Sequence, residues 1–386
     1  MKICFPAREP VKNRIPVITQ KQILLLIAAV IMFWALTLGG SRRYVVTTAV
    51  FAVLFLLIRP KLRLPENLWL LAPSLWIILM GFIAALGEDR VTWYTIQQAT
   101  LYLIPLFFAF AVQLLCPGRE MFFWVDISFL VLGTCVFKFY RAFNWHTFLE
   151  SDYAFIMGAF AVFYFYFRRY GMSGLAFILT IIANKRSALL GAVLIAFLLF
   201  ILRYCGKKEQ NGLPLHRMET LRRMLFPILF VALFAYVGMC RLGGIRAISE
   251  LFGINVQGRA AMWMKMSWTY DFSPFWTGTG LGFLGKILRW MDEWGFFRLH
   301  NDILVYFIET GAASFGMWIL LHAPAWMTKP FHRHSLMIVL LFAYTLLIYS
   351  CDNASVYINY LFPLYTMLMA LLNDDTALYR PLEDNY

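Results

Sequence analysis

Charged residues are scarce in this 386-residue chain: they make up only 14% of it, and 34 Lys and Arg stand against 21 Asp and Glu. An average soluble domain carries about 25% charged residues, so the scarcity argues against an ordinary soluble fold. The basic excess lies beside long apolar runs, where anionic lipid headgroups explain it better than nucleic acid does. We therefore predict no nucleic-acid partner.

Signatures of metals, cofactors and soluble-enzyme active sites are also lacking. The six cysteines have no metal-ligand spacing, and only Cys240 and Cys351 leave a disulfide on the outer face open. The chain has no zinc signature, nucleophile elbow or P-loop. The glycines of "TGTGLGF" at 277–283 lack a surrounding βαβ unit, so a tight turn is the preferred interpretation. The acids of "GEDR" at 87–90 are too isolated to favour a metal. We predict neither metal nor cofactor.

Apolar length is what the sequence has in abundance, with 61% hydrophobic residues, 18% aromatic residues and a mean hydropathy of +0.68. Mainly apolar runs recur along the chain, most of them near the roughly 20 residues that a helix needs to cross about 30 Å of hydrocarbon. None shows the period-two alternation of a membrane strand. The twelve runs are 22–40, 44–58, 68–87, 97–116, 121–137, 153–167, 174–183, 187–203, 225–240, 302–322, 335–351 and 355–372. We therefore predict an all-α integral membrane protein of about twelve spans, forming one polytopic domain over residues 1–386.

The basic residues of the loops predict the orientation. With the N-terminus inside, the cytoplasmic segments hold 20 Lys or Arg and the outer segments hold 14, of which 7 lie in the one long loop that the rule largely ignores. The first run lacks a clear cleavage site and is interpreted as an uncleaved span. Both termini are therefore expected in the cytoplasm.

The long outer loop, residues 241–301, does not look like a free linker. Its stretches "AISELFG", "GRAAMWMKMSWTY" and "GFLGKILRWMDEWGFF" mix apolar and charged residues, a pattern typical of short helices at a membrane interface. We expect such helices between the ninth and tenth spans.

Basic residues on the outer face form candidate anion sites. Lys185 and Arg186 of "ANKRSALLG" occupy a short turn between the seventh and eighth runs, and Arg246 and Arg259 lie in the long loop. A guanidinium can hold two phosphate oxygens with parallel hydrogen bonds. The alternatives are snorkelling of the turn residues to the interface and binding of bulk anionic lipid by the loop.

A polar stripe opens the tenth run, in "RLHNDILVYFIETGAASFG". If Asn301 caps the helix, Asp302, Tyr306 and Glu309 share one face, which should look into the bundle rather than at lipid. His300 stands at the mouth of this face, where it could act as a base or a hydrogen-bond donor. A structural role for His300 remains the alternative.

The order of these elements resembles the bacterial O-antigen polymerase and O-antigen ligase superfamily. Arg186 with Leu190 matches its Arg-x-x-x-Leu pattern, Arg259 matches its Gly-Arg, and "HNDILVYFIETG" matches its His-Asn element. The resemblance covers about residues 180–320. It implies a GT-C-like membrane fold and metal-independent transfer of undecaprenyl-diphosphate-linked glycans on the periplasmic face.

The resemblance also implies roles for residues. His300 would be catalytic, and the pyrophosphate would be bound by Arg186 and Arg259, with Lys185 and Arg246 beside them. Asn301, Tyr306 and Glu309 would support this site. The expected protein is a polymerase of lipid-linked repeat units in the bacterial inner membrane, with donor glycan, acceptor glycan, membrane lipids and a chain-length regulator as partners. A ligase that transfers the glycan to lipid A core, and a flippase or exporter of lipid-linked glycans, are the alternatives.

Overall fold

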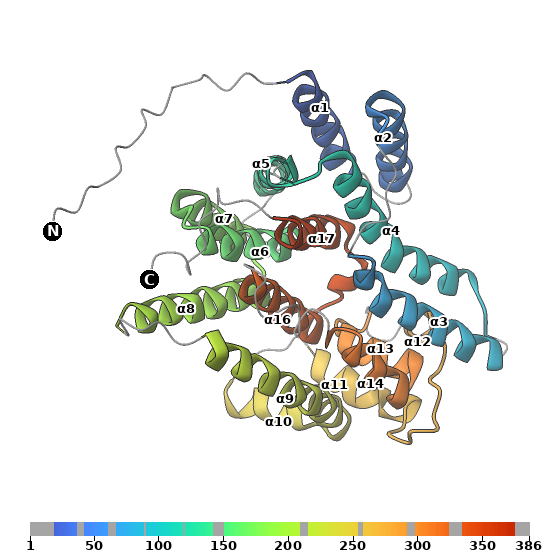
Figure 1. Cartoon of the computed structure of the whole chain (residues 1–386). Coiled ribbons are helices and arrows are strands. Elements are labelled where there is room, and N and C mark those ends of the chain that lie inside the picture. Colours follow the sequence, from blue (N-terminus) through green and yellow to red (C-terminus); the bar gives the residue numbers. More distant parts are fainter. Residues whose placement is uncertain are drawn as a thin grey trace.

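The computed structural model describes residues 19–36, 42–60, 67–88, 90–118, 120–141, 150–208, 215–253, 258–291, 298–323 and 334–374. These residues form helices joined by turns, with no strand among them (Figure 1). The all-α prediction is confirmed for this part of the chain. The predicted cytoplasmic segments at 1–18, 209–214, 324–333 and 375–386, and Asp89 of the acidic pair, lie outside it.

Within the described residues, each predicted apolar run overlaps one helix or more. The helices are α1 (Gln20–Ala35), α2 (Arg42–Ile58), η1 (Leu68–Leu71) with α3 (Ala72–Gly87), α4 (Trp93–Leu115), α5 (Glu120–Arg141), α6 (Tyr153–Tyr166), α7 (Tyr170–Ile182), α8 (Arg186–Lys208), α9 (Leu215–Leu242), α13 (Asp302–Thr310), α14 (Ala312–Leu320), α16 (Ser335–Cys351) and α17 (Ile358–Leu372). The length of the apolar runs predicted them, because long runs without strand alternation leave helix as the structure that satisfies their backbone groups.

Membrane-length helices are fewer than the runs. Within the described ranges, three helical segments are long and apolar enough to cross a bilayer: Leu68–Gly87, Trp93–Leu115 and Glu120–Phe137. A fourth is added if α9 and the following α10 (Gly244–Leu251), which bend by 83° at their junction, count as one span. The other apolar helices are shorter, Gln20–Ala35 and Ile358–Leu372 among them.

The long loop carries short helices, as its mixed composition predicts. They are α10, α11 (Arg259–Lys265), η2 (Met266–Thr269) and α12 (Phe283–Met291). In α10 and α11 a glycine with positive φ precedes the first helical residue, Gly243 at 77° and Gly258 at 75°. Glycine reaches this left-handed conformation at little steric cost, so the loop can change direction sharply where each helix begins.

The C-terminal helix α17 lies at the centre of the bundle and contacts α4, α5 and α6 (Figure 1). Most of its residues are buried, and Phe362 packs against Phe33 of α1 and Phe108 of α4 at ring-centroid separations of 5.8 Å. A helix that is apolar all round belongs in an interior, which explains why the last run of the sequence forms part of the core.

The tenth run is not one continuous helix. It divides into α13 and α14 at Gly311, whose φ is 83°, and the prediction of an uninterrupted span over 302–322 is wrong in this respect. The segment 276–283 crosses the break: the Thr279 and Gly280 N–H groups donate to the Ile308 and Glu309 carbonyls at 2.9 and 3.1 Å. A Cβ on Gly311 would lie 2.1 Å from the Trp276 carbonyl oxygen. Glycine is therefore required where the two backbones meet.

Candidate functional site

Asp352, which follows the last residue of α16, lies at the centre of a cluster of charged side chains. Its side chain is fully buried, and its backbone carbonyl accepts a hydrogen bond from the Asp302 N–H at 3.2 Å, which ties it to the start of α13. A buried carboxylate is costly unless charged or hydrogen-bonding groups surround it. Three of the residues that the sequence analysis singled out supply those groups.

Lys185 makes the shortest ion pair in this cluster. Its Nζ lies 2.7 Å from Asp352 Oδ2 and 3.5 Å from Glu150 Oε2. The turn that carries Lys185 joins α7 to α8, and the Ser151 N–H donates to the Ala183 carbonyl at 2.9 Å. Lys185 is buried. This position does not agree with snorkelling to an interface, the alternative considered for the turn.

Arg259 approaches the same carboxylate from the long loop. It is the first residue of α11, and its Nη1 donates to the Cys351 carbonyl at 3.1 Å and lies 3.8 Å from Asp352 Oδ2. Its Nη2 lies 3.9 Å from Glu150 Oε2. The Trp263 indole N–H, one turn later in α11, donates to the Leu299 carbonyl at 2.8 Å. The helix that bears Arg259 is thus anchored to the residue before His300.

His300 faces the other oxygen of the carboxylate. Its Nδ1 lies 3.2 Å from Asp352 Oδ1, which also accepts from the Asn353 N–H at 2.8 Å. Burial alone would raise the pKa of Asp352, but the His300 hydrogen bond and the Lys185 ammonium outweigh it and hold that pKa well below its usual range. An ionised Asp352 accepts a hydrogen bond from the Nδ1–H of His300, which leaves Nε2 of a neutral imidazole with the free lone pair.

The His300 backbone is held in an unusual conformation by its neighbour Asn301. His300 has a φ of 54°, a left-handed value that is uncommon outside glycine. The Asn301 side-chain oxygen accepts from the Leu304 N–H at 3.0 Å, and its Nδ2 donates to the Tyr236 hydroxyl at 2.8 Å. The predicted helix cap is therefore confirmed. Tyr236 in turn donates to the Ser350 carbonyl, so Asn301 links the start of α13 to α9 and, through Tyr236, to α16.

Glu309 accepts hydrogen bonds from the glycine-rich segment. Its Oε1 accepts from the Gly282 and Leu284 N–H groups at 3.1 and 3.3 Å, at the start of α12. An amide of "TGTGLGF" and the next one but one after it, at Leu284, thus bind a carboxyl group of the same chain. In the described contacts, Glu309 neither braces Tyr306 nor pairs with an arginine. As expected, Asp302, Tyr306 and Glu309 are all buried, and so are the other residues of α13.

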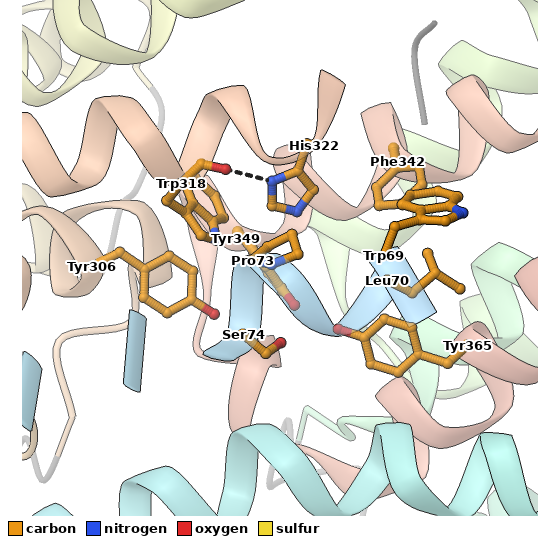
Figure 2. A pocket seen from close by; sticks show the side chains of 10 residues that line it. All are labelled: Trp69, Leu70, Pro73, Ser74, Tyr306, Trp318, His322, Phe342, Tyr349 and Tyr365. Atoms are coloured by element: carbon orange, nitrogen blue, oxygen red, sulfur yellow. Dashed lines mark hydrogen bonds between the residues drawn. The ribbon is translucent and has the colours of Figure 1, made fainter. Parts of the chain in front are cut away.

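Tyr306 lies apart from the charged cluster and lines a separate cavity. Figure 2 shows its ring beside Trp318 and its hydroxyl directed toward Ser74, with Tyr365 on the opposite side of the cavity. Its ring centroid lies 4.9 Å from that of Trp318 and 6.0 Å from that of Tyr349. Tyr306 therefore packs under α13 and does not contact His300.

The two remaining arginines of the predicted site lie at the surface. Arg186 is the first residue of α8 and is exposed, and none of the ion pairs among the described residues involves it. Arg246 is also exposed and pairs with Glu250 of its own helix at 2.8 Å. The structure thus brings Lys185, Arg259 and His300 together. Arg186 lies exposed beside Lys185, and Arg246 pairs with Glu250 instead.

Two acids of the cluster are absent from the sequence-based site. They are Asp352 and Glu150. Asp352 lies between the last two apolar runs, and Glu150 lies near the end of the loop between the fifth and sixth runs. The predicted topology puts the loops that contain 150, 185, 259, 300 and 352 on one face. Considering the acids of all the outer loops together would therefore have identified both residues. Considering each loop by itself did not.

The part of the chain that the structure describes contains no group of three or more His, Cys, Asp or Glu arranged for a metal ion. Glu88 pairs with Arg90 at 3.2 Å. Cys240 and Cys351 are both free thiols, so the disulfide alternative is not realised. Comparison with protein-family models, curated proteins and solved structures finds no match for this chain.

Proposed function

We propose that this protein is a polymerase of undecaprenyl-diphosphate-linked oligosaccharide repeat units. It would join O-antigen or related surface-polysaccharide units by inverting glycosyl transfer without a metal or cofactor, with undecaprenyl diphosphate as the leaving group. The observation that carries the proposal is the His300–Asp352 pair, which lies beside Lys185 and Arg259 at a junction of four loops. Outside this observation, the proposal rests on the family resemblance of residues 180–320.

The chemistry of the cluster suits glycosyl transfer to a hydroxyl group. Ionised Asp352 orients His300 so that Nε2 takes the proton of the acceptor hydroxyl as it attacks the anomeric carbon from the face opposite the leaving group. A carboxylate that holds a histidine in this way also stabilises the imidazolium that forms. Because diphosphate is already a good leaving group, orientation of the acceptor contributes as much as its deprotonation.

Cations beside this pair would stabilise the leaving group. Charge accumulates on the diphosphate as the glycosidic bond breaks, and fixed positive groups act most strongly where charge develops. Arg186, exposed at the N-terminal end of α8, is available to an arriving diphosphate, and the helix end adds a favourable dipole. Lys185 and Arg259 lie deeper and share their charge with Glu150 and Asp352. We leave Arg246 out of the diphosphate site because Glu250 binds it.

The membrane arrangement forms part of the same proposal. Twelve spans in a GT-C-like bundle, with both termini in the cytoplasm of a bacterial inner membrane, would put the cluster at the periplasmic end. Its partners would be the lipid-linked donor and acceptor, membrane lipids and a chain-length regulator. Cysteine scanning with a membrane-impermeant thiol reagent tests the topology: labels at the 88–92 and 184 loops from outside agree with it, and labels there only from inside oppose it.

Two other functions use similar groups. A ligase would transfer the glycan to lipid A core with the same histidine and arginines, and a flippase or exporter would use cations to move the lipid-linked glycan without forming a bond. The spacing of "SPFWTGTGLGF" before "HND" resembles the polymerases more closely. Glycosyl transfer needs a base at the acceptor hydroxyl, and His300, held by Asp352, can fill that role.

A reconstituted system distinguishes the three functions. The purified protein in liposomes is supplied with undecaprenyl-diphosphate repeat units, with and without lipid A core, and the products are separated by gel electrophoresis. Longer lipid-linked chains indicate a polymerase, and transfer only after addition of lipid A core indicates a ligase. Movement of the glycan across the liposome membrane without any new bond would contradict the proposal.

A further inference from the structure

A polar recess is lined by Leu299 and Asn353, the sequence neighbours of His300 and Asp352. It lies between α4, α12, α13 and residues 298–299 and 353–356. Polar side chains from all five of these segments line it, among them Gln98, Arg289, Arg298, Asp302, Glu309 and Asn353. A recess with this lining suits a hydrophilic ligand rather than a lipid chain.

Two residues that line the recess each have a buried polar atom without a hydrogen-bond partner in the described structure. These atoms are Glu309 Oε2 and Asn353 Nδ2, on side chains of residues that are only 2% and 3% exposed. A carboxyl group can hydrogen-bond to a hydroxyl in either protonation state, and the Asn353 Nδ2 donates. A buried polar group without a partner costs on the order of 1–3 kcal/mol, so both atoms favour a ligand that hydrogen-bonds to each of them.

Other polar groups of the recess are fixed by the fold. Asp302 accepts from the Ser355 N–H and hydroxyl at 2.7 and 2.6 Å, and Gln98 Nε2 donates to the Tyr102 hydroxyl at 2.6 Å. Arg289 donates to the Tyr94 hydroxyl at 2.8 Å. These contacts hold the walls in place, so the recess presents a preorganised surface.

The lining combines hydrogen-bond donors with acceptors. Arg289 and Arg298 only donate, the carboxyl groups of Asp302 and Glu309 accept, and the amides of Gln98 and Asn353 do both. A phosphate oxygen mainly accepts hydrogen bonds, whereas a sugar hydroxyl both donates and accepts. The chemistry therefore points to a neutral hydroxylated ring.

The position of the recess identifies which sugar it would hold. Asp352 Oδ2 faces Lys185 and Arg259, while Oδ1 faces His300 and the Asn353 N–H. The Asn353 side chain and Leu299, the neighbour of His300, both line the recess. We infer that this recess is the binding subsite for the acceptor saccharide, with Glu309 and Asn353 as its specificity-determining residues; the word acceptor rests on the proposed function.

Two substitutions test the subsite without disturbing its frame. Glu309→Gln keeps Oε1 as the acceptor for the Gly282 and Leu284 amides and changes only the atom without a partner. Asn353→Ala removes the side-chain amide and keeps the N–H that binds Asp352. Glu250→Gln on the exposed face of α10 is the matched control, and thermal melting of all variants verifies folding.

The measurement is saturation-transfer NMR on the detergent-solubilised protein. Its probe is the oligosaccharide repeat unit released by mild acid from the lipid-linked glycans of the source cells, which carries neither lipid nor diphosphate. The wild type and Glu250→Gln should give equal saccharide signals. Each recess variant should bind about fivefold more weakly, the loss expected for one hydrogen bond. Inorganic pyrophosphate should not displace the saccharide, because Lys185, Arg186 and Arg259, the cations proposed to bind diphosphate, do not line the recess.

The outcomes separate this inference from the proposed function. Wild-type binding in either recess variant, no saccharide binding to the wild type, or displacement by pyrophosphate would overturn the subsite. Saccharide binding should persist in His300→Ala, which lacks the base but keeps the recess. A protein that binds the saccharide through Glu309 and Asn353 yet forms no glycosidic bond would contradict the polymerase and leave the subsite standing.

Discussion

Replacing Asp352 with Asn removes the charge at the centre of the cluster while keeping the shape of the side chain. Lys185 Nζ then loses its carboxylate partner at 2.7 Å, and its own side chain is only 9% exposed. Breaking one partner from a buried ion pair typically costs about 3–5 kcal/mol. Glu150 remains 3.5 Å from Lys185 and is 27% exposed, so a loss near the lower end, about 3 kcal/mol, is expected.

A double-mutant cycle isolates this ion pair. Thermal or denaturant unfolding is followed for Asp352→Asn, Lys185→Gln and the double variant in detergent. Because the double variant leaves no unpaired buried charge, its destabilisation should fall short of the sum of the single effects by at least about 1 kcal/mol. In the proposed reaction, Asp352→Asn should also lower the elongation rate by about 10²–10⁴-fold, since His300 loses the carboxylate that orients it. Additive stabilities together with a near-normal rate would refute the account of the cluster.

Three further predictions follow from other contacts. Arg259→Lys keeps the charge but loses the planar guanidinium group, and it should slow elongation at least about tenfold. The control Arg246→Lys, at an exposed site, should leave the elongation rate unchanged. Equal rates in both variants would count against a role for Arg259 in the reaction. Gly311→Ala should destabilise the protein by about 1–3 kcal/mol from the φ of 83° alone. The control Gly87→Ala, where an added Cβ meets nothing within 4 Å, should melt like the wild type. Similar melting temperatures of both variants would contradict the close approach of residues 276–283 to Gly311. Because the pKa of Asp352 is lowered in the folded state, its stabilising effect is complete above the usual Asp value of about 3.9. It is lost only as the pH falls through the lower folded-state pKa. Between about pH 7 and pH 5, the melting temperatures of the wild type and of Asp352→Asn should therefore change with pH in the same way.

The helical architecture could be predicted well from sequence because hydrophobic length and the lack of alternation leave few other structures for the backbone. The division of the tenth run could not. A glycine such as Gly311 is tolerated inside an apolar helix, so the sequence does not indicate a break there. Only the approach of residues 276–283 shows why the helix ends at Thr310. Such a contact joins positions far apart in sequence, which local patterns do not reveal.

The candidate site was predictable in part for the same reason. Order and spacing identified Lys185, Arg259 and His300, which the structure brings to one carboxylate. Asp352 was missed because a lone acid between two apolar runs carries no local signal. Glu309 was found as a buried acid, but its partners are backbone amides of a distant glycine-rich turn, and backbone donors have no signature in the side-chain sequence.

The stoichiometry of leaving-group release tests the central claim most directly. The reconstituted wild type and His300→Ala are incubated with undecaprenyl-diphosphate repeat units, and mass spectrometry counts both the undecaprenyl diphosphate released and the new glycosidic bonds formed. The proposed reaction predicts one undecaprenyl diphosphate released for each new bond in the wild type, and a loss of both products by about 10²–10⁴-fold in His300→Ala. New bonds without release of undecaprenyl diphosphate, or equal product from both proteins, would contradict it.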